Sequence, residues 1–275
     1  MDRELAAELE ACRVCDPTLE DAPRVRSALA LRQLIDHDVV VVSIRGRRQI
    51  NVSPDAPAAA RAEGLKDVPV MRKLAHELRD FGGTVMLITN PVEAMCHVWE
   101  DTIEARGASV VGLGLSLDAA RAEGLLRRRL SGVGRASNQS LGLVAVGGHA
   151  LGPVLVAPAS TQGRFQQALD TLGTTAEQLV WECRTSVMRR MHEFRRTSIE
   201  PARVFSRDIT RMQQSEAINV SWSVFGPSGE SVGGLVRRQN GRLVPCAVQP
   251  GDAESNRRAV VEFHAQLAGV VSQAP

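Results

Sequence analysis

An apolar run that ends in Thr-Asn-Pro constrains the fold of this chain most strongly. Residues 85–88 read VMLI, and Thr89, Asn90 and Pro91 then interrupt the run. A short apolar segment closed by a turn signal predicts a β-strand, and the similar run VVVV at 39–42 is typical of parallel strands with both faces covered. Parallel sheets place their ligands beyond the carboxyl ends of the strands. Asn90 is therefore a candidate binding residue.

Two further short motifs follow downstream. Residues 117–121 read LDAAR at the start of a predicted helix over 117–130, and residues 147–149 read GGH after a predicted strand over 141–146. Asp118 and Arg121 are three positions apart, so they share one face of that helix. A strand ending in Thr-Asn-Pro, a Leu-Asp-x-x-Arg helix and a Gly-x-His loop, in this order, resemble the lactate/malate dehydrogenase family.

The resemblance implies a role for each of these side chains. His149 would be the general acid/base that exchanges a proton with the substrate, because an imidazole titrates close to neutral pH. Asp118 would hold the other ring nitrogen and favour the imidazolium. Arg121 would bind a substrate carboxylate through two parallel hydrogen bonds. Asn90 would contact both the substrate and a nicotinamide.

Each motif taken alone also has a purely structural interpretation. A histidine after two glycines is often a loop residue, an Asp-x-x-Arg pair is often a solvated ion pair on a helix, and Asn-Pro is often only a turn. The combination of all three in the order of the family favours the functional interpretation.

The segment from 44 to 60 corresponds in the family to a mobile lid. The family's lid carries an arginine that polarises the substrate carbonyl. Arg61, or one of Arg47 and Arg48, would fill this role here, with the register left open because the loop is longer than is usual.

The start of the chain departs from the family pattern. A dinucleotide-binding domain opens with a strand, a Gly-x-Gly-x-x-Gly turn and a helix whose amino terminus holds the pyrophosphate. The given sequence begins instead with a predicted helix over 1–10, followed by a strand that ends near Asp16, where the family places its ribose-binding acid. Either the chain begins downstream of a missing segment or the cofactor site has been lost.

These patterns predict an α/β fold. We expect a truncated Rossmann-like parallel sheet over 1–112, and an α+β catalytic domain of the lactate/malate dehydrogenase type over 113–275. In the second half, Asn240-Gly241 predicts a hairpin turn between strands at 235–239 and 243–248.

Composition excludes several classes of function. The net charge is only +2, which gives no sign of nucleic-acid binding, and no apolar run is long enough to span a membrane. The five cysteines include no second pair to complete a zinc site, so we expect no metal. A cytoplasmic protein is the default expectation, and analogy with the family suggests a homodimer or a larger homo-oligomer.

The leading functional hypothesis is a protein without a cofactor. It would bind a carboxylate-bearing small molecule or peptide in the inherited pocket, as an accessory module or as a non-redox acid/base enzyme. The alternative hypothesis is a working NAD-dependent 2-hydroxy-acid dehydrogenase of the malate or lactate type.

Overall fold

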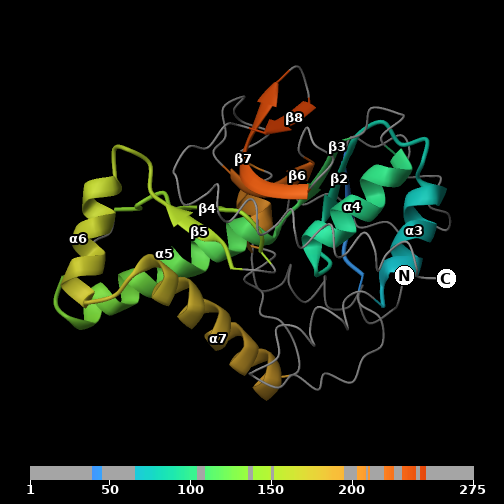
Figure 1. Cartoon of the computed structure of the whole chain (residues 1–275). Coiled ribbons are helices and arrows are strands. Elements are labelled where there is room, and N and C mark those ends of the chain that lie inside the picture. Colours follow the sequence, from blue (N-terminus) through green and yellow to red (C-terminus); the bar gives the residue numbers. More distant parts are fainter. Residues whose placement is uncertain are drawn as a thin grey trace, which may run out of the picture.

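The computed structural model is an α/β structure built on a mixed sheet (Figure 1). It describes residues 39–44, 66–103, 109–135, 139–149, 152–194, 203–208, 210, 220–225, 231–239 and 242–245. Among these residues, the main sheet has six strands in the order β1-β2-β3-β6-β7-β8. Their bounds are β1 Val39–Val42, β2 Thr84–Leu87, β3 Ser109–Gly112, β6 Val220–Phe225, β7 Ser231–Gln239 and β8 Arg242–Pro245. The predicted α/β class is confirmed.

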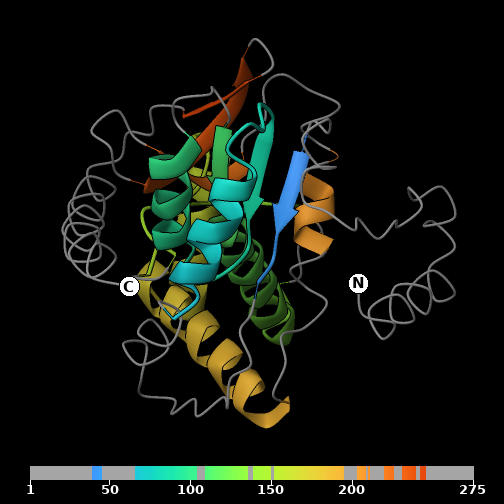
Figure 2. The ribbon, with the colours of Figure 1, turned by 90° about the vertical axis from the view of Figure 1, so that its right-hand side faces the viewer.

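The first three strands are parallel and in register. Val39 pairs with Thr84, and Thr84 pairs with Ser109, so the carboxyl ends of β1, β2 and β3 meet at one edge. Helices α3 (Val68–Glu77) and α4 (Val92–Ile103) connect these strands and lie side by side on one face of the sheet (Figures 1 and 2). This edge is where a parallel sheet binds its ligands.

The side chains of β2 and β3 alternate between two apolar clusters, as the period of two in a strand requires. Val85, Leu87 and Val110 pack with α3 and α4 around the fully buried Trp99. Met86 and Val111 point the other way, toward Leu117 of helix α5 (Gly114–Gly132) and the helical segment 203–208.

The strand β1 differs from this pattern and from the prediction. Val40 and Val42 are buried, but Val39 and Val41 are 41% and 49% exposed. The two-sided cover predicted from the VVVV run is therefore wrong for β1. The cluster on the second face includes side chains of β2 and β3 but none of β1.

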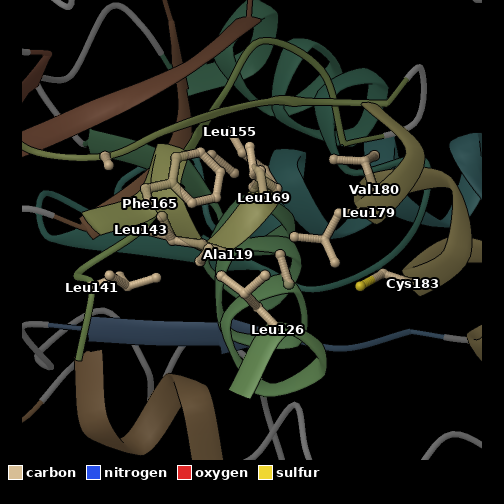
Figure 3. Close-up of a cluster of buried hydrophobic side chains, with 14 of the residues drawn as sticks. Ala119, Leu126, Leu141, Leu143, Leu155, Phe165, Leu169, Leu179, Val180 and Cys183 are labelled. Carbon is tan, nitrogen blue, oxygen red and sulfur yellow. The ribbon is translucent and has the colours of Figure 1, made fainter. Parts of the chain in front are cut away.

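A second group of elements extends from the end of β3. Helix α5 (Gly114–Gly132) leads to the antiparallel hairpin β4 (Val144–Val146) and β5 (Val154–Val156), and then to α6 (Gln162–Leu172) and α7 (Ala176–Phe194). Apolar side chains from all five elements, including Ala145 of β4, form one cluster, and Figure 3 shows those from α5, β5, α6 and α7. The cluster fixes α5 against the hairpin.

Some predicted boundaries shift for identifiable reasons. The predicted strand 141–146 begins only at Val144, because the backbone N–H groups of Leu141 and Leu143 donate to the Glu123 carboxylate instead of to a neighbouring strand. Helix α5 begins at Gly114 rather than at 117. The predicted hairpin is present, although β7 begins at Ser231 rather than at 235.

Other expectations fall elsewhere. The predicted helix at 1–10 and the strand that ends near Asp16 lie outside the described residues. The six-stranded sheet joins strands from both sides of residue 112, and the division into 1–112 and 113–275 stays a prediction. Within the described residues, no helix is both long and apolar enough to cross a membrane.

Candidate active site

The site centres on His149, which follows β4 in the loop toward β5. Its Nδ1 lies 2.6 Å from Oδ2 of Asp118 on α5, and the two side chains are only 18% and 8% exposed. A carboxylate accepts hydrogen bonds and donates none, so Nδ1 carries the proton of this bond. The other ring nitrogen, Nε2, then remains for proton exchange with a ligand.

Opposing influences set the protonation of this imidazole. Burial by itself lowers the pKa of His149, but the charge and hydrogen bond of Asp118, together with the charge of Glu93, outweigh it. Arg121 acts in the opposite direction, and the net result is a pKa raised above 6.5. The site therefore favours an imidazolium at neutral pH more than water does.

The backbone of His149 is also held by hydrogen bonds from two helices. Its N–H donates to Oε1 of Glu93 on α4 at 2.7 Å, and its carbonyl accepts from Nη1 of Arg184 on α7 at 3.3 Å. Gly114, the first residue of α5, touches the ring so closely that an added Cβ would lie 2.5 Å from Cγ of His149. Three helices thus fix one loop residue.

Asn90 and Arg121 complete the predicted set. Asn90 follows β2 at the carboxyl edge of the parallel strands, where its side chain is exposed, and it precedes Pro91 through a cis peptide bond. Arg121 is partly buried and close enough to His149 for its charge to affect the imidazole. Thr89 links the segments that follow β1 and β2, since its Oγ1 accepts a hydrogen bond from the Ile44 N–H and donates one to the Ile44 carbonyl.

The remaining predicted site residues cannot be placed in this arrangement. Asp16, Arg47, Arg48 and Arg61 lie outside the described residues. In the described part of the chain, no three histidine, cysteine or acidic side chains are grouped so that they could hold a metal ion.

Sequence reasoning missed Glu93 and Arg184. Glu93 follows the Asn-Pro-Val motif in the first turn of α4, where an acidic residue is favoured simply by the helix dipole. Nothing in the sequence indicates that this side chain is buried or that it bonds to a loop 56 positions away. Arg184 is one of many arginines, and only the packing of α7 brings it to His149.

Solved dehydrogenase structures resemble the whole chain. The malate dehydrogenase of Plasmodium falciparum aligns over 97% of this chain and 85% of its own, with a TM-score of 0.75 and 13% identity. The malate dehydrogenase of Archaeoglobus fulgidus, solved in complex with NADH, aligns over 97% and 86%, with a TM-score of 0.69 and 14% identity. This chain has the lactate/malate dehydrogenase fold. The resemblance inferred from its three motifs is confirmed.

Sequence comparison is consistent with this fold over a shorter stretch. The L-lactate dehydrogenases of Mycoplasma capricolum and Mycoplasma mycoides are each 30% identical to it over 99 residues. The matched stretch is 35% of this chain and 29% of each of these enzymes. No protein-family model matches the chain.

The hypothesis of a protein without a cofactor is contradicted. Proteins with this same dehydrogenase fold were solved with their nicotinamide cofactors, including the Archaeoglobus fulgidus malate dehydrogenase with NADH. The lactate dehydrogenase of Cryptosporidium parvum, solved with lactic acid and nicotinamide adenine dinucleotide, aligns over 97% of this chain and 86% of its own. Its TM-score is 0.73 and its identity is 13%. The inference from the missing glycine turn relied on the order of motifs at the start of the chain, a region outside the described residues.

Proposed function

We propose that this protein is an NAD-dependent dehydrogenase that interconverts small 2-hydroxy acids and 2-keto acids. The observation that carries the proposal is the 2.6 Å contact between His149 and Asp118, placed beside Arg121 within a lactate/malate dehydrogenase fold. An acid/base pair next to a guanidinium suits a substrate with a hydroxyl or carbonyl group adjacent to a carboxylate.

The residues present fit the nicotinamide end of the cofactor. The carboxyl ends of β1, β2 and β3 form one edge, fixed by Thr89, and the exposed Asn90 offers an amide that can donate and accept at that edge. Asp16, the residue predicted for the adenosine end of the cofactor, lies outside the residues that the structure describes. When bound, NAD would supply the hydride acceptor.

The protein's own groups would act as follows. Arg121 binds the substrate carboxylate, and Asn90 orients the substrate at the edge of the sheet. In the oxidation direction, Nε2 of His149 takes the proton of the substrate hydroxyl as the C–O bond becomes a carbonyl. Asp118 then stabilises the imidazolium through Nδ1. In the reduction direction, the imidazolium returns that proton to the carbonyl oxygen.

The two directions of the reaction need opposite protonation states of His149, so their rates depend on pH in opposite ways. Reduction needs the imidazolium, so its rate is expected to hold below the raised pKa and to fall as the pH rises through it. Oxidation needs the neutral imidazole and is expected to show the reverse. Assembly into a homo-oligomer and a cytoplasmic location stay predictions.

The test is turnover by the 275-residue chain. We expect NADH oxidation when the chain is mixed with pyruvate or oxaloacetate, and a loss of kcat of about 10²–10⁴-fold in His149→Asn, since general acid/base catalysis contributes on this scale. Arg121→Lys is expected to raise KM sharply, because an ammonium cannot make the two-pronged contact. Wild-type protein that binds no NADH in calorimetry and turns over neither acid would refute the proposal.

A further inference from the structure

Glu93 is a buried carboxylate that the reaction outlined above does not use. It lies in the first turn of α4 and is 1% exposed. Burying a carboxylate is costly unless polar partners compensate for its lost hydration. One partner is the backbone N–H of His149, which donates to Oε1 at 2.7 Å. A charge-assisted bond of this length is among the stronger ones in proteins.

Glu93 bonds a part of His149 that the other side chains around it do not bond. Asp118 on α5 bonds the ring, Arg184 on α7 bonds the backbone carbonyl, and Glu93 on α4 bonds the backbone N–H. Within the described part of the chain, the charged side chains that act on or bond His149 are the carboxylates of Asp118 and Glu93 and the guanidiniums of Arg121 and Arg184. Glu93 is the second negative charge, and its effect on the imidazole is opposite to that of Arg121.

We propose that Glu93 is a positioning residue for His149, which fixes the place of the imidazole through the backbone N–H and acts on the ring by its charge. Where turnover is concerned, the proposal rests on the proposed dehydrogenase function. The influence on protonation does not, because it is a property of the folded chain without any ligand.

The two parts of the role follow from different features of the side chain. A bond to the backbone N–H limits how far the loop after β4 can move, and misplacement of a reacting group by about 1 Å can cost roughly 10²-fold in rate. The charge acts on the ring through space, and an opposite charge nearby favours the ionised form of a titrating group. Charge and length can therefore be varied separately.

The experiment is a titration of His149 in the full chain, followed through its imidazole resonances by NMR. The chain has six histidines, and the His149→Asn variant assigns the signal. Glu93→Gln keeps the size and the acceptor oxygen but removes the charge, and we expect the titration midpoint to fall by roughly half a pH unit or more. Glu93→Asp keeps the charge but shortens the side chain, so the midpoint should stay near the wild-type value.

Glu123→Gln is the matched control. Its carboxylate also accepts hydrogen bonds from a backbone segment before β4, at Leu141 and Leu143, but it is not among the groups that shift the pKa of His149. Glu123→Gln should leave the midpoint unchanged. A shift of the same size in both glutamine variants would show a general loosening of the hairpin and would overturn the role of Glu93.

Turnover supplies the readout of position. In Glu93→Asp we expect kcat to fall about tenfold or more while KM changes little, because the imidazole is misplaced and the arginine that binds the carboxylate is not. A midpoint in Glu93→Gln equal to that of the wild type would overturn the charge effect. If Glu93→Gln does not fold, Glu93→Asp decides, and an unchanged kcat there would refute the positioning role.

Failure of the dehydrogenase proposal gives a different pattern. If the wild type is inactive toward every acid tested, the His149 midpoint still reports the influence of Glu93. A shifted midpoint in an inactive protein would support the charge effect of Glu93 and refute only the dehydrogenase proposal, and an unshifted midpoint in an active protein would overturn only the charge effect.

Discussion

Along α5, Leu126 enters the apolar cluster of Figure 3, whereas Asp118 on the same helix holds the ring of His149. The first region is stabilised by apolar area removed from water, a contribution without direction that is shared among many side chains. The second depends on charged groups at defined distances, and each buried charge needs its partner. One helix therefore joins a region tolerant of many apolar residues to a region that tolerates few changes.

The largest expected effect on stability lies in the apolar region. Leu126 is fully buried, so Leu126→Ala should lower the free energy of unfolding by about 2–5 kcal/mol, from lost apolar contact and from the cavity left behind. Chemical denaturation monitored by circular dichroism measures this change.

The comparison predicts that the same variant spares the polar region. The NMR titration midpoint of His149 should match the wild type in Leu126→Ala, because Leu126 lies eight positions beyond Asp118 on α5, about 12 Å along the helix axis. A clear shift of the midpoint would mean that the two regions of α5 are coupled through the helix.

These two regions also differ in how far the sequence predicted them. The strands β1 and β2 could be predicted because short apolar runs bounded by turn residues are typical of buried strands. Burial on both faces of β1 was predicted wrongly, because the run VVVV does not say how far the covering elements reach. The meeting of Asp118 with His149 came from family resemblance, since no local pattern brings together residues 31 positions apart.

The polar region was predicted only in part for the same reason. Glu93 and Arg184 act on the backbone of His149, and such contacts depend on tertiary packing rather than on residue type. Gly114 begins α5, three positions before Leu117 of the Leu-Asp-x-x-Arg motif. Its close contact with the imidazole gives that position a steric reason.

A smaller expected effect comes from adding one methyl group at the junction of the two regions. In Gly114→Ala the new Cβ would lie 2.5 Å from Cγ of His149, so the ring or the start of α5 has to shift. Overpacking of this kind costs about 1–3 kcal/mol in stability. Turnover should fall more than stability suggests, by roughly 10²-fold, because the ring moves away from its substrate.

Gly124→Ala offers a matched control on the same helix. Apart from the neighbouring residues and the backbone of its own helix, no heavy atom lies within 4 Å of a Cβ added there, and alanine favours the helix by up to about 1 kcal/mol relative to glycine. Thermal unfolding should show unchanged or increased stability, with normal turnover. Equal activity of Gly114→Ala and the wild type would show that the site adapts to the crowding and is less constrained than the comparison implies.

The smallest expected effect is the dependence of stability on pH that His149 contributes. Its pKa is raised in the folded protein, so the folded state binds the proton more tightly than the unfolded state. The stabilisation is complete below the unfolded value of about 6.5 and is lost as the pH rises through the folded pKa. Each unit by which the pKa is raised corresponds to about 1.4 kcal/mol.

Because other groups titrate in the same range, the measured quantity is the difference in unfolding free energy between the wild type and His149→Asn at several pH values. That difference should favour the wild type most at pH 6 and decrease toward pH 9, whereas the difference between the wild type and Leu126→Ala should stay constant. A wild-type advantage over His149→Asn that grows with pH would mean that the effect of burial on the pKa of His149 outweighs that of both carboxylates. The polar region would then disfavour the imidazolium.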